Sequence, residues 1–513
     1  MIKFDKSRFI FNKNIAVCLL IILGIVLRLR QYLFDRSLWI DEAMISLNLI
    51  QRSFSELFQK LDYNQGAPIG FLYVEKLLIS LFGNSEYVLR LFPLICGIFS
   101  IFLFYNLVNK LFPQEISIFP LGLFCLLNPT IYYSSEVKQY SGDLLFTILI
   151  LIIIVDFLEE KQLRKSKLIM YGFLLSISIW FSFAAIFVLF GGLIALSLYS
   201  FFEHRNLKGL SYIWFFSVLS FLLFYKLFLS NLDASEIRNF YSTEFLHFPP
   251  TGSELALFFR KLFYFGTFSE NLFAKILFFI GVFSMVRSRR ALILVLLSTL
   301  TLALLASSFY LYPLVVRFLL FLIPALLILI AEGAYFLYKF FRNNIIVFLV
   351  ACFITLIPVV NLSFVVFRNP YKTEEIKPVL NYIKENKQNN DLIYIYYSAE
   401  YAYKYYAKRY GFNNDLIPEQ SQYKYQAGLK RVYEKPGYNK IILGIRARNR
   451  NEEYINDINR LKGNKRVWFL FSHAYGQELP FFVNYLDSIG KRINSFSSID
   501  AAAYLYDLKG DVL

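Results

Sequence analysis

Long apolar stretches recur along the chain, and they constrain its fold more than any other feature. Residues 291–307 and 318–330 are two examples, and each is nearly free of charge. A helix needs about 20 consecutive apolar residues to cross the hydrocarbon core of a bilayer. Hydrophobic residues make up 57% of the chain, more than a soluble domain carries. The sequence therefore predicts a polytopic α-helical membrane protein.

About eleven transmembrane helices are expected. The first follows a basic N-terminal segment, but no small-residue cleavage site comes after it, so we expect a retained span rather than a signal peptide. The expected spans are residues 14–33, 91–111, 116–133, 142–158, 168–183, 185–203, 210–230, 271–286, 291–309, 317–338 and 345–366.

The positive charges are spread over short loops between these spans. The formal net charge is +16, but this distribution follows the positive-inside rule and argues against a nucleic-acid-binding protein. The most basic short loops are residues 161–167, 204–208, 287–290 and 339–342. If these loops are cytoplasmic, the N-terminus is cytoplasmic as well. The segments on the outer face are then residues 34–90, 134–141, 231–270, 310–316 and the tail from 367.

The chain becomes polar after Arg368-Asn369-Pro370. We therefore expect two domains, a transmembrane catalytic domain over 1–366 and a soluble periplasmic or extracellular α/β domain over 367–513. The expected tail elements are a helix capped by Thr373 that runs through Ile383, a strand at 391–397, a helix at 400–410, a strand at 440–444, a helix at 452–461 and strands at 466–471 and 502–506.

Two outer loops contain apolar residues at helical spacing. They are residues 51–62 in the loop 34–90, and residues 253–265 in the loop 231–270. This spacing predicts amphipathic juxtamembrane helices that lie along the membrane surface. Such helices could simply pack on the bundle, or they could form the walls of a groove for a lipid-borne substrate.

An acidic pair, Asp41-Glu42, follows the first span and is surrounded by Trp39, Ile40 and Ala43. The pair could be an ordinary solvated group at the membrane boundary. However, carboxylates in apolar settings near a membrane tend to be functional. Burial raises the pKa of a carboxyl group, as a general base that works near neutral pH requires.

Further polar residues lie in the outward-facing segments. Glu136, Lys138, Tyr140 and Asp143 cluster where the fourth span begins, and they could instead cap that helix. Arg317 enters the tenth span, where it could either extend to the interface or bind an anion through its guanidinium group. The three histidines, which are His204, His247 and His473, are isolated in the sequence and have no predicted role.

Taken together, these segments resemble the GT-C superfamily of glycosyltransferases, which use sugars linked to lipid phosphates. The branch most similar contains the protein O-mannosyltransferases and the lipid A aminoarabinose transferase. The matching segments, in order over residues 15–340, are Asp41-Glu42, Gln65-Gly-Ala-Pro68, residues 83–93 with Arg90, residues 133–140 and residues 317–324. Gln65 replaces a commoner histidine and Lys138 a commoner arginine, which leaves the donor and the acceptor open.

The resemblance implies an inverting transfer from a polyprenyl-phosphate sugar to a lipid, glycan or protein on the outer face of a bacterial inner membrane. Asp41 would be the general base, and Glu42 would orient it or the acceptor. Arg317, Lys138 and Arg90 would bind the donor phosphate. The substrate-binding candidates are Gln65, Glu136, Tyr140 and Asp143.

No cofactor is evident in the sequence, although Asp41 and Glu42 could bind a divalent metal ion. The main alternative function is a polytopic transporter or a flippase for a lipid-linked or small substrate. Transporters usually show repeated halves or paired broken helices, and the sequence shows neither.

Overall fold

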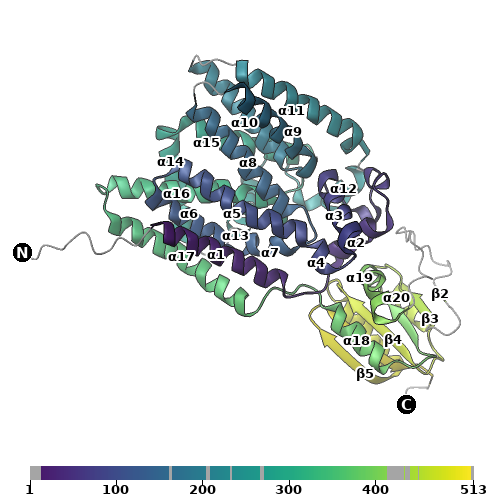
Figure 1. Ribbon diagram of the computed structural model, residues 1–513. Helices are drawn as coiled ribbons and strands as arrows, with labels where there is room; N and C mark the ends of the chain where they lie inside the picture. Colours follow the sequence, from purple (N-terminus) through teal and green to yellow (C-terminus); the bar gives the residue numbers. More distant parts are fainter. Residues whose placement is uncertain are drawn as a thin grey trace, which may run out of the picture. The chain divides into compact units, whose positions relative to one another are not determined.

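The protein is described by a computed structural model (Figure 1). The described residues are 13–160, 164–203, 208–231, 234–265, 268, 271–412, 432–433, 440–448 and 450–509. Parts of two predicted basic loops, residues 161–163 and 204–207 with His204, lie outside them. The chain forms two compact units. The first comprises residues 1–34, 54–60 and 66–371, and the second comprises residues 35–53, 61–65 and 372–513.

The first unit is a bundle of helices. Its long apolar helices pack side by side, notably α14 on α16, α10 on α15, and α5 on α8 (Figure 1). Its α-helices are α1 (Lys13–Tyr32), α3 (Ile69–Phe82), α4 (Glu86–Leu89), α5 (Leu91–Leu111), α6 (Gln114–Leu126), α7 (Asn128–Tyr132), α8 (Tyr140–Glu159), α9 (Lys165–Phe181), α10 (Ala185–Phe202), α11 (Lys208–Leu227), α12 (Ala234–Phe240), α13 (Gly252–Phe265), α14 (Leu272–Ser288), α15 (Arg290–Ser308), α16 (Ile323–Phe340) and α17 (Ile345–Arg368). Short 3-10 helices include η1 (Glu56–Phe58), η3 (Tyr133–Ser135) and η6 (Val316–Leu322).

Each of the eleven predicted spans coincides with helical structure. Among the described residues, eight helices are long and apolar enough to cross a membrane, and α6 with α7 and η3 forms a ninth candidate that bends by 58°. The other two predicted spans correspond to α9 and α14, which have 17 residues each and are short for a full crossing. The protein is thus an integral membrane protein, while the number of crossings stays a prediction.

The predicted amphipathic helix over 51–62 is wrong. The structure has only the three-residue η1 there, and Phe54 and Phe58 both pack edge-on against Tyr73 of α3, with ring centroids 5.3 and 5.4 Å apart. These contacts with another element override a periodicity that suits a helix. A helix does occur in the second loop, where α13 covers the predicted 253–265, and its position along a membrane surface stays a prediction.

Over the residues that the structure describes, the second unit is built on a six-stranded sheet with the order β2-β3-β1-β4-β6-β5. The central strand β1 pairs in parallel with β3 and β4, whereas β6 joins β4 and β5 in antiparallel. The fold class predicted for the tail is therefore confirmed. The strands are β1 (Leu392–Ile395), β2 (Val432–Tyr433), β3 (Lys440–Leu443), β4 (Val467–Ser472), β5 (Lys491–Ser498) and β6 (Ala501–Asp507), and the helices are α18 (Ile376–Asn386), α19 (Glu400–Tyr406), α20 (Asn451–Asn459) and α21 (Glu478–Ile489).

This unit also contains part of the first outer loop, which the sequence assigned to the transmembrane domain. Helix α2 (Ile40–Gln51) packs on α19 of the tail. Helix α18 begins at Ile376 rather than directly after the predicted cap Thr373, and the Thr373 hydroxyl makes no hydrogen bond within the described chain. The reason is that Glu374 and Glu375 turn their carboxylates toward the segment before α2 instead of extending the helix.

Candidate active site

The segment that precedes Asp41 is held by hydrogen bonds from the tail. The backbone N–H of Ile40 donates to Glu374 Oε2 at 3.1 Å, and the N–H of Leu38 donates to the Tyr406 hydroxyl at 2.9 Å. Ser37 donates through its hydroxyl to Glu375 Oε2 at 3.1 Å. Carboxylates are favoured here because the first N–H groups of a helix have no partner within the helix. The tail thus fixes the N-terminus of α2.

The two acidic residues of the predicted pair have different surroundings. Glu42 is fully buried and faces the equally buried Arg36, with Nη1 to Oε2 at 2.8 Å. It also accepts the Trp39 N–H at 3.4 Å. Asp41 is only partly buried and interacts electrostatically with His473. Glu42 is therefore paired with Arg36 in the buried interior, whereas Asp41 is the more accessible of the two carboxylates.

His473, which had no predicted role, lies next to Glu374. Its Nδ1 is 2.6 Å from Glu374 Oε1, and Asp500 Oδ2 is 4.0 Å away. Burial acts to lower the pKa of His473, but the hydrogen bond and charge of Glu374, with Asp500 and Asp41, outweigh burial and leave that pKa raised. One feature of the sequence could have indicated this residue: His473 follows directly after a buried strand, and polar residues at the ends of such strands often bind ligands.

A second group of predicted residues meets in the first unit. Arg317 Nη2 donates to the Tyr241 hydroxyl at 3.1 Å, and Arg317 and Glu136 both act electrostatically on Tyr133. Tyr140 packs edge-on against Tyr133, with ring centroids 5.1 Å apart. The structure therefore brings Glu136, Tyr140 and Arg317 together around shared tyrosines. Tyr241 was not predicted from the sequence.

Asp143 adjoins this group. It is buried, it is hydrogen-bonded to Ser182, and it acts electrostatically on Tyr312. The Tyr312 hydroxyl donates to the backbone carbonyl of Phe318 at 3.0 Å, and the two rings are 5.9 Å apart. This connects the start of α8 to the segment around Arg317.

The remaining predicted residues have separate positions. Lys138 is buried in the turn between η3 and α8, where its N–H donates to the Glu136 carbonyl. Arg90 is buried between α4 and α5 and interacts with Tyr32. Gln65 belongs to the second unit and donates through Nε2 to Met44 Sδ at 3.2 Å. Gln65 thus contacts α2 at Met44, which follows Asp41 by three positions in the sequence.

Glu75 on α3 was not predicted as a site residue, yet its surroundings are unusual. Its side chain is fully buried, and neither carboxylate oxygen has a hydrogen-bond partner in the described part of the chain. Helix α3 is not among the candidate spans. Burial raises the pKa of Glu75 well above its ordinary value, because the charged form is poorly solvated there. The folded protein therefore favours the protonated side chain.

This shift predicts a pH-dependent effect of Glu75→Gln. A carboxyl whose pKa is raised in the folded state makes that state less stable as the pH rises above the unfolded value. Glutamine carries no charge at either pH. We therefore expect the unfolding temperature of the variant to exceed that of the wild type by more at pH 8 than at pH 5. Thermal unfolding of the detergent-solubilised protein measures this gain, with the exposed Glu203→Gln as control. An equal difference at both pH values would contradict the prediction.

Comparisons with known proteins agree with this architecture. Residues 66–228 match the family model described as dolichyl-phosphate-mannose-protein mannosyltransferase. No curated protein sequence matches the chain. Residues 66–228 include Arg90, Glu136, Lys138, Tyr140 and Asp143.

Two solved structures are similar to this protein over most of the chain. ArnT from Cupriavidus metallidurans, bound to undecaprenyl phosphate, has a TM-score of 0.51 and 11% identity over 95% of this chain and 97% of its own. The oligosaccharyltransferase of Archaeoglobus fulgidus, in complex with Zn and sulfate, has a TM-score of 0.53 and 11% identity over 94% of this chain and 72% of its own. The chain therefore has the GT-C fold, and its residues 66–228 match the model of the dolichyl-phosphate-mannose-protein mannosyltransferase family.

Proposed function

We propose that the protein is a glycosyltransferase that moves a sugar from a polyprenyl phosphate to an acceptor hydroxyl of a lipid, glycan or protein. The fold shared with ArnT, which was crystallised with undecaprenyl phosphate, supports such a donor. The family match over 66–228 supports the reaction class. We assign the reaction to the outer face of a bacterial inner membrane, in line with the basic loops predicted to be cytoplasmic.

One observation carries the proposal: Asp41 is a partly exposed carboxylate on a helix whose start is held by three hydrogen bonds from the tail. A general base needs a fixed position within hydrogen-bond reach of the proton it removes. Its neighbour Glu42 is neutralised by Arg36. In this proposal Glu42 positions the turn that carries Asp41, and Asp41 acts on the acceptor.

The reaction then runs as a single inverting displacement. The acceptor oxygen bonds to the anomeric carbon while the bond from that carbon to the phosphate oxygen breaks. The electron pair leaves with the polyprenyl phosphate, and the hydroxyl proton moves to Asp41. Positive charge develops on the sugar in the transition state, as in glycoside hydrolysis, and a nearby carboxylate stabilises it.

The departing phosphate needs cations, for which we propose Arg317, Lys138 and Arg90. Arg317 is the best placed because Tyr241 orients its guanidinium while the side chain remains partly exposed. Planar guanidinium groups bind phosphate through paired hydrogen bonds. Tyr140, Glu136 and Asp143 would contact the sugar, and Gln65 the acceptor.

The proposed function predicts a covalent product in a purified system. The full-length protein in liposomes is supplied with undecaprenyl-phosphate sugars labelled in the sugar, in a panel of hexoses and pentoses, together with a lipid extract as acceptor. We expect at least one donor to release undecaprenyl phosphate and to yield a new labelled glycolipid. Movement of intact labelled donor across the bilayer, without a covalent product, would instead identify a flippase.

A further inference from the structure

We propose that Glu374, His473 and Asp500 form a divalent cation site in the tail unit. The three residues offer ligand atoms that all lie within 4.8 Å of one another. They come from three separate places in the chain, namely the segment before α18, the end of β4 and the turn between β5 and β6. The proposal does not depend on sugar transfer, because it concerns the binding of a metal ion only.

The sheet topology explains why these residues converge. The chain leaves β1 toward β3 on one side and then crosses to β4 on the other, so the order changes direction at β1 and β4. In open sheets, ligands bind beyond the carboxyl ends of the strands at this switch point. His473 follows the last residue of β4, and its N–H donates to the Asp500 carbonyl at 3.1 Å. The turn that carries Asp500 is thereby held beside the imidazole.

The ligand spacing suits a small cation. Metal–ligand distances of about 2.0–2.2 Å place neighbouring ligands of a tetrahedral zinc ion about 3.3 Å apart. His473 Nδ1 is 2.6 Å from Glu374 Oε1 and 4.0 Å from Asp500 Oδ2. These two distances differ from that spacing by about 0.7 Å each, and all three ligand atoms lie within 4.8 Å of one another.

The second oxygen of Glu374 is already oriented by neighbours. It accepts the Ile40 N–H at 3.1 Å and the Ser472 hydroxyl at 3.4 Å. Contacts of this kind fix the direction of a metal ligand and strengthen binding. Since Ile40 is the first residue of α2, a cation held by Glu374 would also tie the N-terminus of α2 to the sheet.

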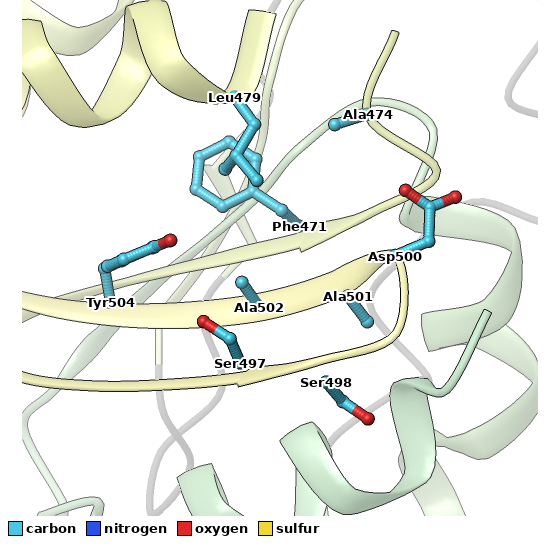
Figure 2. Close-up of a pocket in the computed structure, with 9 residues that line it drawn as sticks. All are labelled: Phe471, Ala474, Leu479, Ser497, Ser498, Asp500, Ala501, Ala502 and Tyr504. Carbon is cyan, nitrogen blue, oxygen red and sulfur yellow. The ribbon is translucent and has the colours of Figure 1, made fainter.

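The surroundings provide negative charge and room for water. Asp41 adds a further carboxylate within electrostatic reach of His473. Asp500 also lines a cavity of about 130 Å³ together with Ser497, Ser498 and Tyr504 (Figure 2). That volume holds several water molecules, so water can reach the Asp500 side of the site. One imidazole and two carboxylates favour Zn²⁺ or Mn²⁺ over Mg²⁺, which prefers oxygen ligands alone.

Calorimetric titration of the full-length, chelator-treated protein with Zn²⁺ tests the site. We expect one equivalent to bind, and affinity to fall at least tenfold in His473→Gln and in Asp500→Asn. Asparagine tolerates the left-handed backbone of Asp500, whose φ is +49°, so this variant keeps the turn even if His473→Gln does not fold. His247→Gln is the matched control, because His247 pairs with a single carboxylate, Glu254.

Backbone exchange gives an independent readout. Zn²⁺ should slow amide hydrogen exchange at residues 37–45 in the wild type and in His247→Gln, but not in Asp500→Asn. The proposal is overturned if the wild type binds no Zn²⁺, or if Asp500→Asn and the wild type bind it equally well. Absence of sugar transfer, in contrast, would leave this result unaffected.

Discussion

Asp41→Asn is expected to lower the rate of sugar transfer at least about 100-fold while the protein stays folded. General base catalysis typically contributes about 10²–10⁴-fold to a rate, and asparagine cannot accept the hydroxyl proton. The fold should persist because the hydrogen bonds that anchor the start of α2 use backbone groups of Leu38 and Ile40 and the Ser37 hydroxyl, not the side chain of Asp41. We therefore expect kcat to fall and KM for the donor to change little.

Asp35→Asn is the matched control for this experiment. Asp35 belongs to the same segment, but its carboxylate is about half exposed and pairs with Lys377 at 3.1 Å. It should retain transfer within about twofold, since exposed ion pairs contribute about 1 kcal/mol or less. If Asp41→Asn keeps a near-normal rate with an unchanged unfolding temperature, Asp41 is not the base. A rise in KM alone would assign it to substrate binding instead.

The transmembrane part of the fold was predictable because a chain segment in lipid can adopt few backbone conformations. A segment in hydrocarbon has to satisfy its backbone hydrogen bonds internally, so a long apolar run becomes a helix. The residues around Tyr133 and Arg317 were predicted for a related reason. Polar residues are rare in such runs, and those that occur at helix ends stand out.

The association of α2 with the tail was not predictable. Ile40 and Glu374 are hydrogen-bonded although they are separated by more than 300 positions, and neither hydrophobic periodicity nor helix capping rules report such a pairing. The start of α18 was predicted too early for the same reason. In the sequence, Glu374 and Glu375 look like ordinary residues of a first helical turn, and their contacts with distant residues are not visible. His473 was overlooked because its partners Glu374 and Asp500 are distant in sequence.

The anchoring of α2 also changes what a deletion of the tail can show. From the sequence, residues 367–513 form a separate domain that could be removed. In the structure, residues 35–53 belong to the same compact unit as the tail. Removing the tail would therefore take away the bonding partners of the segment before Asp41, and a loss of activity would not distinguish acceptor selection from loss of the base. Point substitutions in and around α2 are the more informative experiments.

Arg36→Met is expected to destabilise this unit strongly. Arg36 and Glu42 are 1% and 0% exposed, and removing one partner of a buried ion pair typically costs about 3–5 kcal/mol, because the other charge stays buried without compensation. Helix α2 should then open far more often than in the wild type. Amide hydrogen exchange at residues 37–51 of the full-length protein should accelerate about 100-fold or more, since about 1.4 kcal/mol corresponds to tenfold.

The double variant Arg36→Met/Glu42→Leu separates the ion pair from the packing around it. It leaves no buried charge, so it should recover most of the lost protection, apart from about 1 kcal/mol for the hydrogen bond that Glu42 accepts from Trp39. Arg450→Met is the exposed control, because Arg450 and Glu453 are 61% and 45% exposed and such pairs contribute about 1 kcal/mol or less. If Arg36→Met exchanges no faster than Arg450→Met, the buried Arg36–Glu42 pair does not stabilise α2. A double variant that recovers stability but not sugar transfer would show that the pair also positions the base.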